Sequence, residues 1–200
     1  MIKRKILIAA AILLSAGWGV RFSMVNKDVD IPVVQIYERG AAAPIETDFF
    51  DYGDEGMDGY SVTVLDAELL SAEAFLQRYN ASEQAKKLGT FTDAIYVVRV
   101  LVANHDNPYT GEKGIDLKRY VLQGTNYTLS FEETCCQIAN PNLPGSSFSL
   151  QKGTEMELTL TFDVMSQITG NQLLQKDPPM LQISQYPHQK LLRLDGASDL

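Results

Sequence analysis

The stretch Ala94–Ala103 constrains the fold most strongly, because it is apolar on nearly both faces and rich in β-branched residues. Such a stretch is typical of a central strand that is covered on both sides. A second stretch, residues 155–163, alternates strictly, with Met156, Leu158, Leu160 and Phe162 separated by polar residues. This alternation predicts a strand with one core face and one wet face. The chain is therefore expected to fold around β-sheet.

Shorter period-two segments recur along the chain, with turn residues between them. We expect further strands at residues 31–37, 60–70, 120–122, 126–131, 135–139, 180–186 and 190–194, and a long loop at residues 41–59. The adjacent apolar pair Val64-Leu65 interrupts the alternation and predicts a β-bulge. Ser71 begins one short helical pattern, in which Phe75 and Tyr79 lie four residues apart. Many short strands and one short helix predict an all-β, antiparallel β-sandwich.

The predicted core combines apolar positions from strands that lie far apart in the sequence. These positions are Val62, Val64, Tyr96, Val98, Val100, Val102, Leu158, Leu160 and Phe162.

The N-terminus has the pattern of an export signal. A basic tripeptide at residues 3–5 precedes an uncharged, mostly apolar run, Ile6–Val20, which Arg21 ends. This order is typical of segments that a secretion translocon accepts, and the basic residues predict a cytoplasmic N-terminus. Residues 1–25 are thus either a signal-anchor helix, which holds the protein in the cell membrane as a single-pass protein with its C-terminal domain outside, or a cleaved signal peptide of a secreted protein. No cysteine lies near the end of the run, which excludes a lipoprotein anchor.

The rest of the chain has room for one domain. We expect a linker at residues 26–30, a β-sandwich domain at residues 31–195 and a polar tail at residues 196–200. The net charge is -8, and without the three basic residues at positions 3–5 the chain carries 14 basic and 25 acidic residues, a net charge of -11. Because phosphate binding requires clustered Lys and Arg, this charge argues against nucleic acid as a partner.

Four segments of the chain carry a resemblance to known proteins. Gly59–Leu70, Tyr96–Asn104, Leu117–Tyr127 and Ala139–Ser147 resemble uncharacterised exported proteins of Firmicutes, which are similar in turn to the telokin-like, immunoglobulin-like domains of many Gram-positive lipoproteins. The resemblance covers most of residues 30–195 and consists of a strand pattern. It implies an extracytoplasmic immunoglobulin-like β-sandwich and brings no catalytic residues with it.

The only two cysteines, Cys135 and Cys136, are adjacent and provide no disulfide framework. We expect two small, partly buried residues in or beside a strand; a vicinal disulfide is the alternative and requires a strained turn. A zinc site requires further Cys or His ligands. The two histidines, His105 and His188, lie far apart in turn-rich segments, where we expect them to be solvated.

An acidic loop offers the best candidates for a metal site. It contains Asp48, Asp51, Asp54, Glu55 and Asp58, and clustered carboxylates suit calcium. Asp54 and Asp58 are the candidate ligands, although Leu65 occupies the position where an EF-hand requires a bidentate Glu. No cofactor other than an irregularly bound calcium ion is therefore expected, and a solvated loop is the alternative.

Aromatic residues in two long loops, residues 46–59 and 104–114, are candidate binding residues. They are Phe49, Phe50, Tyr52 and Tyr109. Aromatic rings beside acids suit a cationic partner, but the rings of the first loop also suit packing against the core. We expect a non-enzymatic binding or scaffolding domain at the cell envelope, with an envelope protein or another exported protein as partner. The alternative is an envelope hydrolase that uses carboxylates of residues 48–58, one of them with a raised pKa in a cleft.

The export signal makes the topology testable. An alkaline phosphatase fused after Leu200 should be active, because it would fold outside the cytoplasm, and a cytoplasmic reporter at the same position should be silent. Enzyme assays on whole cells measure both, and the reverse pair of results would contradict an extracytoplasmic domain.

Overall fold

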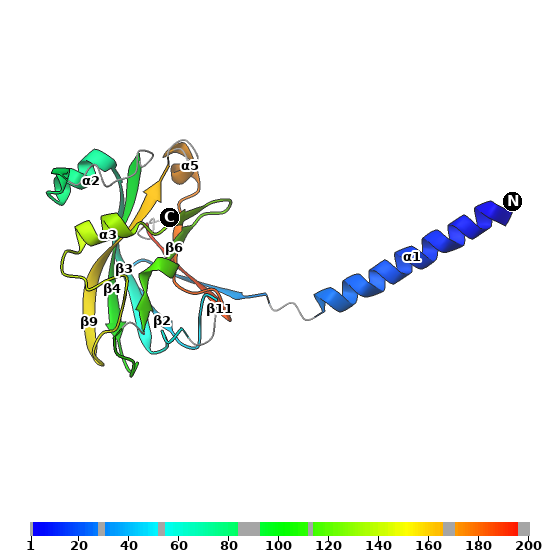
Figure 1. Ribbon diagram of the computed structural model, residues 1–200, viewed down its shortest axis with the longest axis horizontal. Helices are drawn as coiled ribbons and strands as arrows, with labels where there is room; N and C mark the ends of the chain where they lie inside the picture. The colour runs from blue at the N-terminus through cyan, green and yellow to red at the C-terminus, as the bar shows by residue number, and fades with distance from the viewer. Residues whose placement is uncertain are drawn as a thin grey trace. The chain divides into compact units, whose positions relative to one another are not determined.

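The computed structural model describes residues 2–27, 31–51, 55–83, 93–111, 114–165 and 171–195. The chain divides into two compact units, Met1–Ile31 and Pro32–Leu200. Figure 1 shows the first unit as a single helix and the second as a β-rich body.

The first unit consists of helix α1 (Ile2–Asn26, 25 residues). At ~1.5 Å per residue the helix is about 37 Å long, which exceeds the ~30 Å hydrocarbon core of a bilayer. The predicted apolar run is extended at its C-terminal end by Phe22, Met24 and Val25, which are also exposed. By length and composition, Arg4–Asn26 is one helix that can cross a membrane.

The described strands of the second unit form three sheets. The five-stranded sheet has the order β1 (Val33–Tyr37), β11 (His188–Arg193), β10 (Met180–Gln182), β6 (Val121–Gln123), β7 (Thr128–Ser130). The four-stranded sheet has the order β2 (Ala42–Ile45), β3 (Tyr60–Ser71), β4 (Ala94–Asn104), β9 (Thr154–Val164), and β5 (Ile115–Asp116) pairs with β8 (Ser147–Phe148). All these pairs are antiparallel except β1 and β11, which are parallel.

The two larger sheets bury one face each in a shared hydrophobic core. Leu122, Leu181 and Leu192 of the five-stranded sheet lie in the same buried cluster as the predicted core residues of β3, β4 and β9. Eight of the nine predicted core residues are buried. Tyr96 differs, because it is only partly buried at the margin of this cluster.

The predicted bulge is confirmed. The register of β3 against β4 shifts between Val64 and Asp66, which leaves the carbonyl of Leu65 outside the regular ladder. Arg39 fills this gap, since its Nε and Nη2 donate to the Leu65 carbonyl at 3.0 and 2.9 Å, and Nη2 also lies 2.7 Å from Asp66 Oδ1.

The predicted helix is confirmed as α2 (Ala72–Arg78). The Ser71 hydroxyl accepts a hydrogen bond from Ala74 N at 3.1 Å, and the rings of Phe75 and Tyr79 lie 4.8 Å apart. The expectation of a single short helix is wrong, because α3 (Glu133–Ala139) and α5 (Asn171–Lys176) also form.

Helix α3 replaces the strand expected at residues 135–139. The Glu132 carboxylate accepts from Cys135 N at 2.5 Å and caps the helix, while the Asn140 amide donates to Cys136 O at 2.7 Å and Thr159 O at 2.8 Å. Both cysteines are free and buried. Consecutive side chains on a helix point about 100° apart, so the vicinal disulfide is not formed. Burial raises the pKa of both thiols, that of Cys136 to about 12.

The loop expected at residues 41–59 begins later than predicted, because Ala42–Ile45 forms β2. Pro44 lies in this strand, where it pairs with Ser61 of β3. Since β2 is at the edge of its sheet, the missing N–H of proline does not interrupt a second ladder.

Candidate functional site

The two predicted loops lie side by side. The Asn107 side-chain amide donates to Gly56 O at 2.7 Å and to Asp58 O at 2.6 Å, and His105 N donates to Gly59 O at 2.9 Å. Gly59 has φ +82, and a Cβ at this position would lie 2.8 Å from Asn107 N. Glycine is therefore required where the loops approach each other.

Asn104 stabilises the second loop where it contacts the first. Its side-chain amide donates to the carbonyls of Asn107 and Leu150 at 3.1 and 2.7 Å, and its Oδ1 accepts from Asn107 N at 2.8 Å. The side chain is buried, so these bonds form away from competing water and hold the second loop in one conformation.

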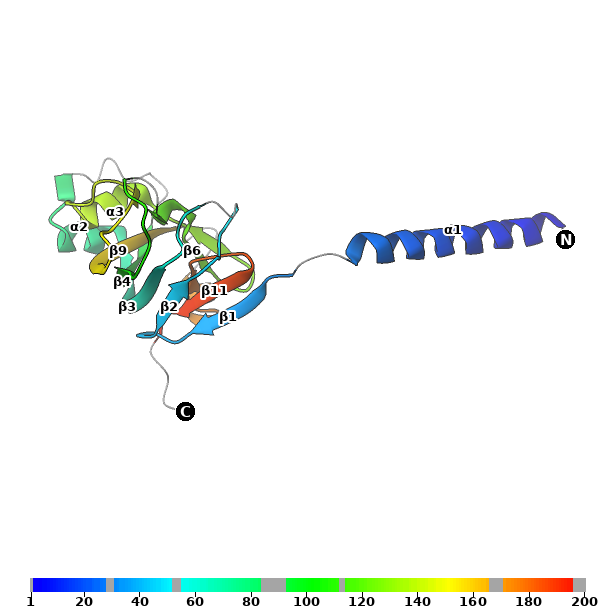
Figure 2. The same ribbon diagram turned by 90° about the horizontal axis from the view of Figure 1, so that it is seen from below.

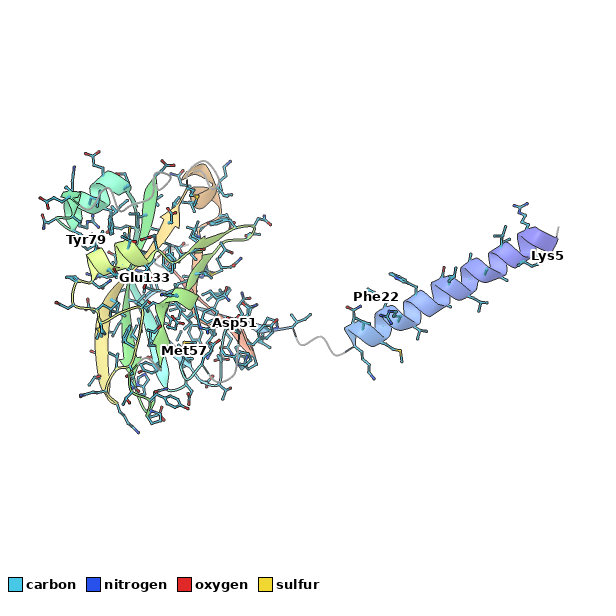
Figure 3. The ribbon with its side chains drawn as sticks, in the orientation of Figure 1. Lys5, Phe22, Asp51, Met57, Tyr79 and Glu133 are labelled. Atoms are coloured by element: carbon cyan, nitrogen blue, oxygen red, sulfur yellow. The ribbon has the colours of Figure 1, made fainter. Side chains whose placement is uncertain are left out.

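A cavity of about 260 Å³ opens where the loops meet. It is lined by Glu46, Thr47, Asp48, Phe49, Glu55, Gly56, Met57, Asp58 and Tyr109. Figure 3 labels two residues of the first loop, Asp51 and Met57, below Glu133 in that view. Among the described residues, the lining thus combines four carboxylates with two aromatic rings.

A buried ion pair lies behind the cavity. Lys190 Nζ is 2.6 Å from Asp48 Oδ2, and the side chains of both residues are 0% exposed. Lys190 Nζ also donates to Pro44 O at 2.6 Å and lies 3.2 Å from Glu46 Oε2. His188, two residues earlier on β11, places Nδ1 2.9 Å from Asp48 Oδ1. The pair therefore ties β11 of one sheet to the chain that leaves β2 of the other.

The environment of Asp48 keeps it ionised. Burial by itself raises the pKa of this carboxyl, but hydrogen bonds from Lys190 and His188, together with the charge of Lys190, outweigh burial and lower the pKa below its ordinary value. A carboxylate with a lowered pKa stabilises the fold above its unfolded pKa of about 3.9, and this contribution is lost as pH falls through the lower folded value. At neutral pH the stabilisation is fully present.

A second ionic cluster fixes the middle of the acidic loop. Arg119 belongs to the 3-10 helix η2 (Leu117–Arg119). Its Nη1 lies 2.8 Å from both Asp51 Oδ2 and Glu55 Oε1, and its Nε lies 3.2 Å from Asp116 Oδ2. The Glu55 carboxylate also accepts from the backbone N–H groups of Phe50 and Asp51 at 2.9 and 2.7 Å. Glu55 is therefore a structural anchor of the loop.

The four candidate binding aromatics have different positions. Phe49 forms an isolated bridge with Tyr186, with ring centroids 6.2 Å apart, and Phe50 packs against Tyr120 at 6.2 Å. Both rings thus pack the loop against the domain, although Phe49 also lines the cavity. Tyr109 is 42% exposed at the cavity. Tyr52 lies outside the described residues.

The calcium hypothesis stays a prediction. Asp58 is exposed and lines the cavity, whereas Asp54 lies outside the described residues. Within the part of the chain that the structure describes, no group of three or more His, Cys, Asp or Glu side chains is arranged to hold a metal ion.

Sequence reasoning missed Lys190 and Arg119 and misplaced His188. His188 was expected to be solvated, but it is partly buried against Asp48. His105 is exposed, as expected, and its Nε2 lies 2.8 Å from the hydroxyl of Ser61, a buried residue of β3. A strand with His188 and Lys190 two residues apart has both on one face, which was the available signal for this cluster.

The chain belongs to the family of a domain of unknown function, DUF5028, whose sequence model matches residues 34–190. The matched region begins within β1 and ends at Lys190, so it includes the whole cavity lining and both members of the buried pair. No curated protein and no solved structure matches the chain.

The buried pair predicts a strong effect of removing one partner. Lys190→Met should lower the free energy of unfolding by about 3–5 kcal/mol, because it leaves Asp48 buried without its counter-charge. Urea unfolding at pH 7 measures the change.

The control is the double variant Lys190→Met with Asp48→Asn, which removes both charges and should recover part of the loss. A single variant within about 1 kcal/mol of the wild type would contradict a stabilising role for the pair.

Proposed function

We propose that this protein is a non-enzymatic binding domain held at the outer face of the bacterial cell membrane by α1, and that its acidic cavity binds a cationic group of an envelope protein or another exported partner. The observation that carries this proposal is the convergence of both loops on one cavity that combines carboxylates with an exposed tyrosine ring.

The charge balance of the cavity favours a cation. Four of the described lining residues are carboxylates, and two described cations lie against them: Lys190 next to Asp48 and Arg119 next to Glu55. Glu46 and Asp58 are exposed at the same cavity, so a net negative charge remains at its mouth. Desolvated carboxylates beside a cavity attract a positive group more strongly than carboxylates on an open surface.

The size and the aromatic lining favour an organic cation. A cavity of about 260 Å³ is smaller than the ~300–1,000 Å³ typical of drug-sized ligands, and it suits the end of a lysine or arginine side chain. Tyr109, which is 42% exposed, brings an aromatic ring to the cavity. A cation within ~6 Å of a ring centroid, over the ring face, gains about 0.5–2 kcal/mol.

The hydrolase alternative receives less support. A carboxylate general acid needs a raised pKa, and the acidic side chain at the cavity with a resolved shift, Asp48, has a lowered one. Calcium remains the second candidate ligand, because Glu46 and Asp58 offer exposed oxygens at one cavity.

The same proposal assigns the domain to the immunoglobulin-like β-sandwiches and α1 to the cell membrane. Two sheets that share one core, joined by turns and a few short helices, support an immunoglobulin-like β-sandwich of the type found in exported proteins of Firmicutes; the parallel pair β1 and β11 departs from a purely antiparallel sandwich. The length of α1 supports a retained signal anchor, with a cleaved signal peptide as the alternative.

Removing the charges at the cavity mouth tests the function. In the full-length protein in detergent micelles, Glu46→Gln combined with Asp58→Asn should weaken binding of a capped hexalysine peptide at least about tenfold, which corresponds to ~1.4 kcal/mol. Isothermal titration calorimetry at low salt measures the affinity.

The matched control is Glu155→Gln combined with Glu157→Gln, which removes two acids from β9, outside the cavity lining. Its affinity should stay within about twofold, allowing for weak long-range attraction. Equal weakening by both double variants would contradict a defined site, and binding of calcium ions but not of the peptide would replace the organic cation with a metal.

A further inference from the structure

Strand β1 forms a free edge of the five-stranded sheet. In the described part of the chain it pairs only with β11, along which it lies in Figure 2. Its side chains are unusually exposed for an apolar strand: Val33 is 60% exposed, Val34 54% and Ile36 49%. An apolar strand with one unpaired edge is a template for another strand.

The hydrogen-bonding groups on that edge follow from the ladder on the other side. Val33 N donates to Pro187 O at 3.1 Å, which directs the N–H groups of Val33, Gln35 and Tyr37 toward β11. Because successive residues of a strand direct their backbone groups to opposite edges, the N–H and C=O groups of Val34 and Ile36 point to the free edge.

The other described edges of the two larger sheets carry features that discourage pairing. Strand β2 contains Pro44, β9 carries Glu155 and Glu157, and β7 has only three residues. Proline, charge and short length are the devices that protect edges. Residues 31–37 contain no charged side chain, and their only proline, Pro32, precedes β1.

We infer that β1 is an interface between two copies of this chain, which pair antiparallel about a two-fold axis at Gln35. In this register Val34 of one copy lies opposite Ile36 of the second copy. The outward N–H and C=O groups of these two residues then form the hydrogen-bonded type of antiparallel pair. The two-fold axis generates a second, identical pair between Ile36 of the first copy and Val34 of the second. All four outward N–H groups at the interface are thereby satisfied.

The side chains and the charge fit the same register. Ile36 lies beside Leu191 in the sheet, and Val34 and Ile36 point to one face, so two copies would join their exposed apolar side chains in one patch. A second copy carries the same net negative charge, which opposes association through acidic surfaces. Residues 31–37 carry no charge, so two copies can meet there without electrostatic repulsion between their acidic side chains. A contact about a two-fold axis uses the same surface patch on both copies, so that patch must be complementary to itself.

This inference does not depend on the cavity. The lining residues of the cavity lie on the two loops, and none of them belongs to β1, so either proposal can fail while the other stands.

Cysteine cross-linking of the full-length protein in membrane vesicles tests the register. Gln35→Cys places two thiols at the two-fold axis, where opposed Cα atoms of a non-hydrogen-bonded pair lie ~4.5 Å apart, within the ~4.4–6.8 Å that a disulfide accepts. Under mild copper oxidation it should form a covalent dimer, visible on a non-reducing gel. The wild-type protein should not, because Cys135 and Cys136 are buried.

The matched control is Val33→Cys, which lies on the same strand. Its thiol would lie opposite Tyr37 of the second copy, and its own counterpart would be offset by four residues, about 13 Å along the strand. It should therefore cross-link at least about tenfold more slowly than Gln35→Cys.

A second variant tests the backbone pairing. Val34→Pro, added to Gln35→Cys, removes an outward N–H but leaves the ladder with β11, so cross-linking should fall about tenfold while the melting temperature is unchanged. Three results would overturn the proposal: equal cross-linking by the two cysteine variants, unchanged cross-linking in the proline variant, or no dimer from Gln35→Cys. A covalent product with a different protein would also overturn it and would show that β1 pairs with a strand of that protein.

Discussion

The buried pair of Lys190 and Asp48 is the interaction on which the arrangement of this domain depends. Burying two charges costs several kcal/mol per ion unless the geometry is good and the remaining donors and acceptors are satisfied. Here the ammonium group has three oxygen partners, since Pro44 O and Glu46 Oε2 complete the contact with Asp48. One strand of the five-stranded sheet is thereby held against the segment that follows β2 of the four-stranded sheet.

This constraint also positions the cavity. Asp48 can lie at the back of the cavity because Lys190 neutralises it, and Glu46 is held at the mouth by the same ammonium group. Farther along the loop, Arg119 has an equivalent effect on Glu55. The loop therefore keeps its acids close together through internal counter-charges, and the exposed acids that remain give the cavity its negative character.

The sheets are predictable because the order of apolar and polar residues within each strand reflects which faces of that strand are buried. The alternation in β9 and the double apolar face of β4 identify the core, and Val64-Leu65 identifies the bulge. Helix α3 was missed because a short apolar run fits both the strand and the helix period, and the capping by Glu132 and Asn140 decides between them. Strand β2 was missed because Pro44 reads as a loop residue until its edge position is known.

The site was only half predictable, for a different reason. The acids and aromatics of both loops are visible as composition, and the structure brings the loops together. Their counter-charges come from distant parts of the chain: Lys190 lies 144 positions from Glu46, and Arg119 lies 64 positions from Glu55. The spacing of His188 and Lys190 puts both on one face of a strand but does not say which acids they meet. Whether an acid in the loop is exposed or neutralised depends on such distant partners. The sequence therefore could not show that Asp58 is exposed at the cavity while Glu55 is paired with Arg119.

The central claim, that the cavity between the loops takes up a cationic group, is tested most directly by amide NMR of the isotope-labelled full-length protein during titration with butylammonium, a mimic of the lysine side chain. The account predicts saturable shifts confined to the amides that border the cavity, such as Gly56, Met57 and Tyr109. Shifts that grow linearly without saturation, or that centre on another surface of the domain, would contradict it.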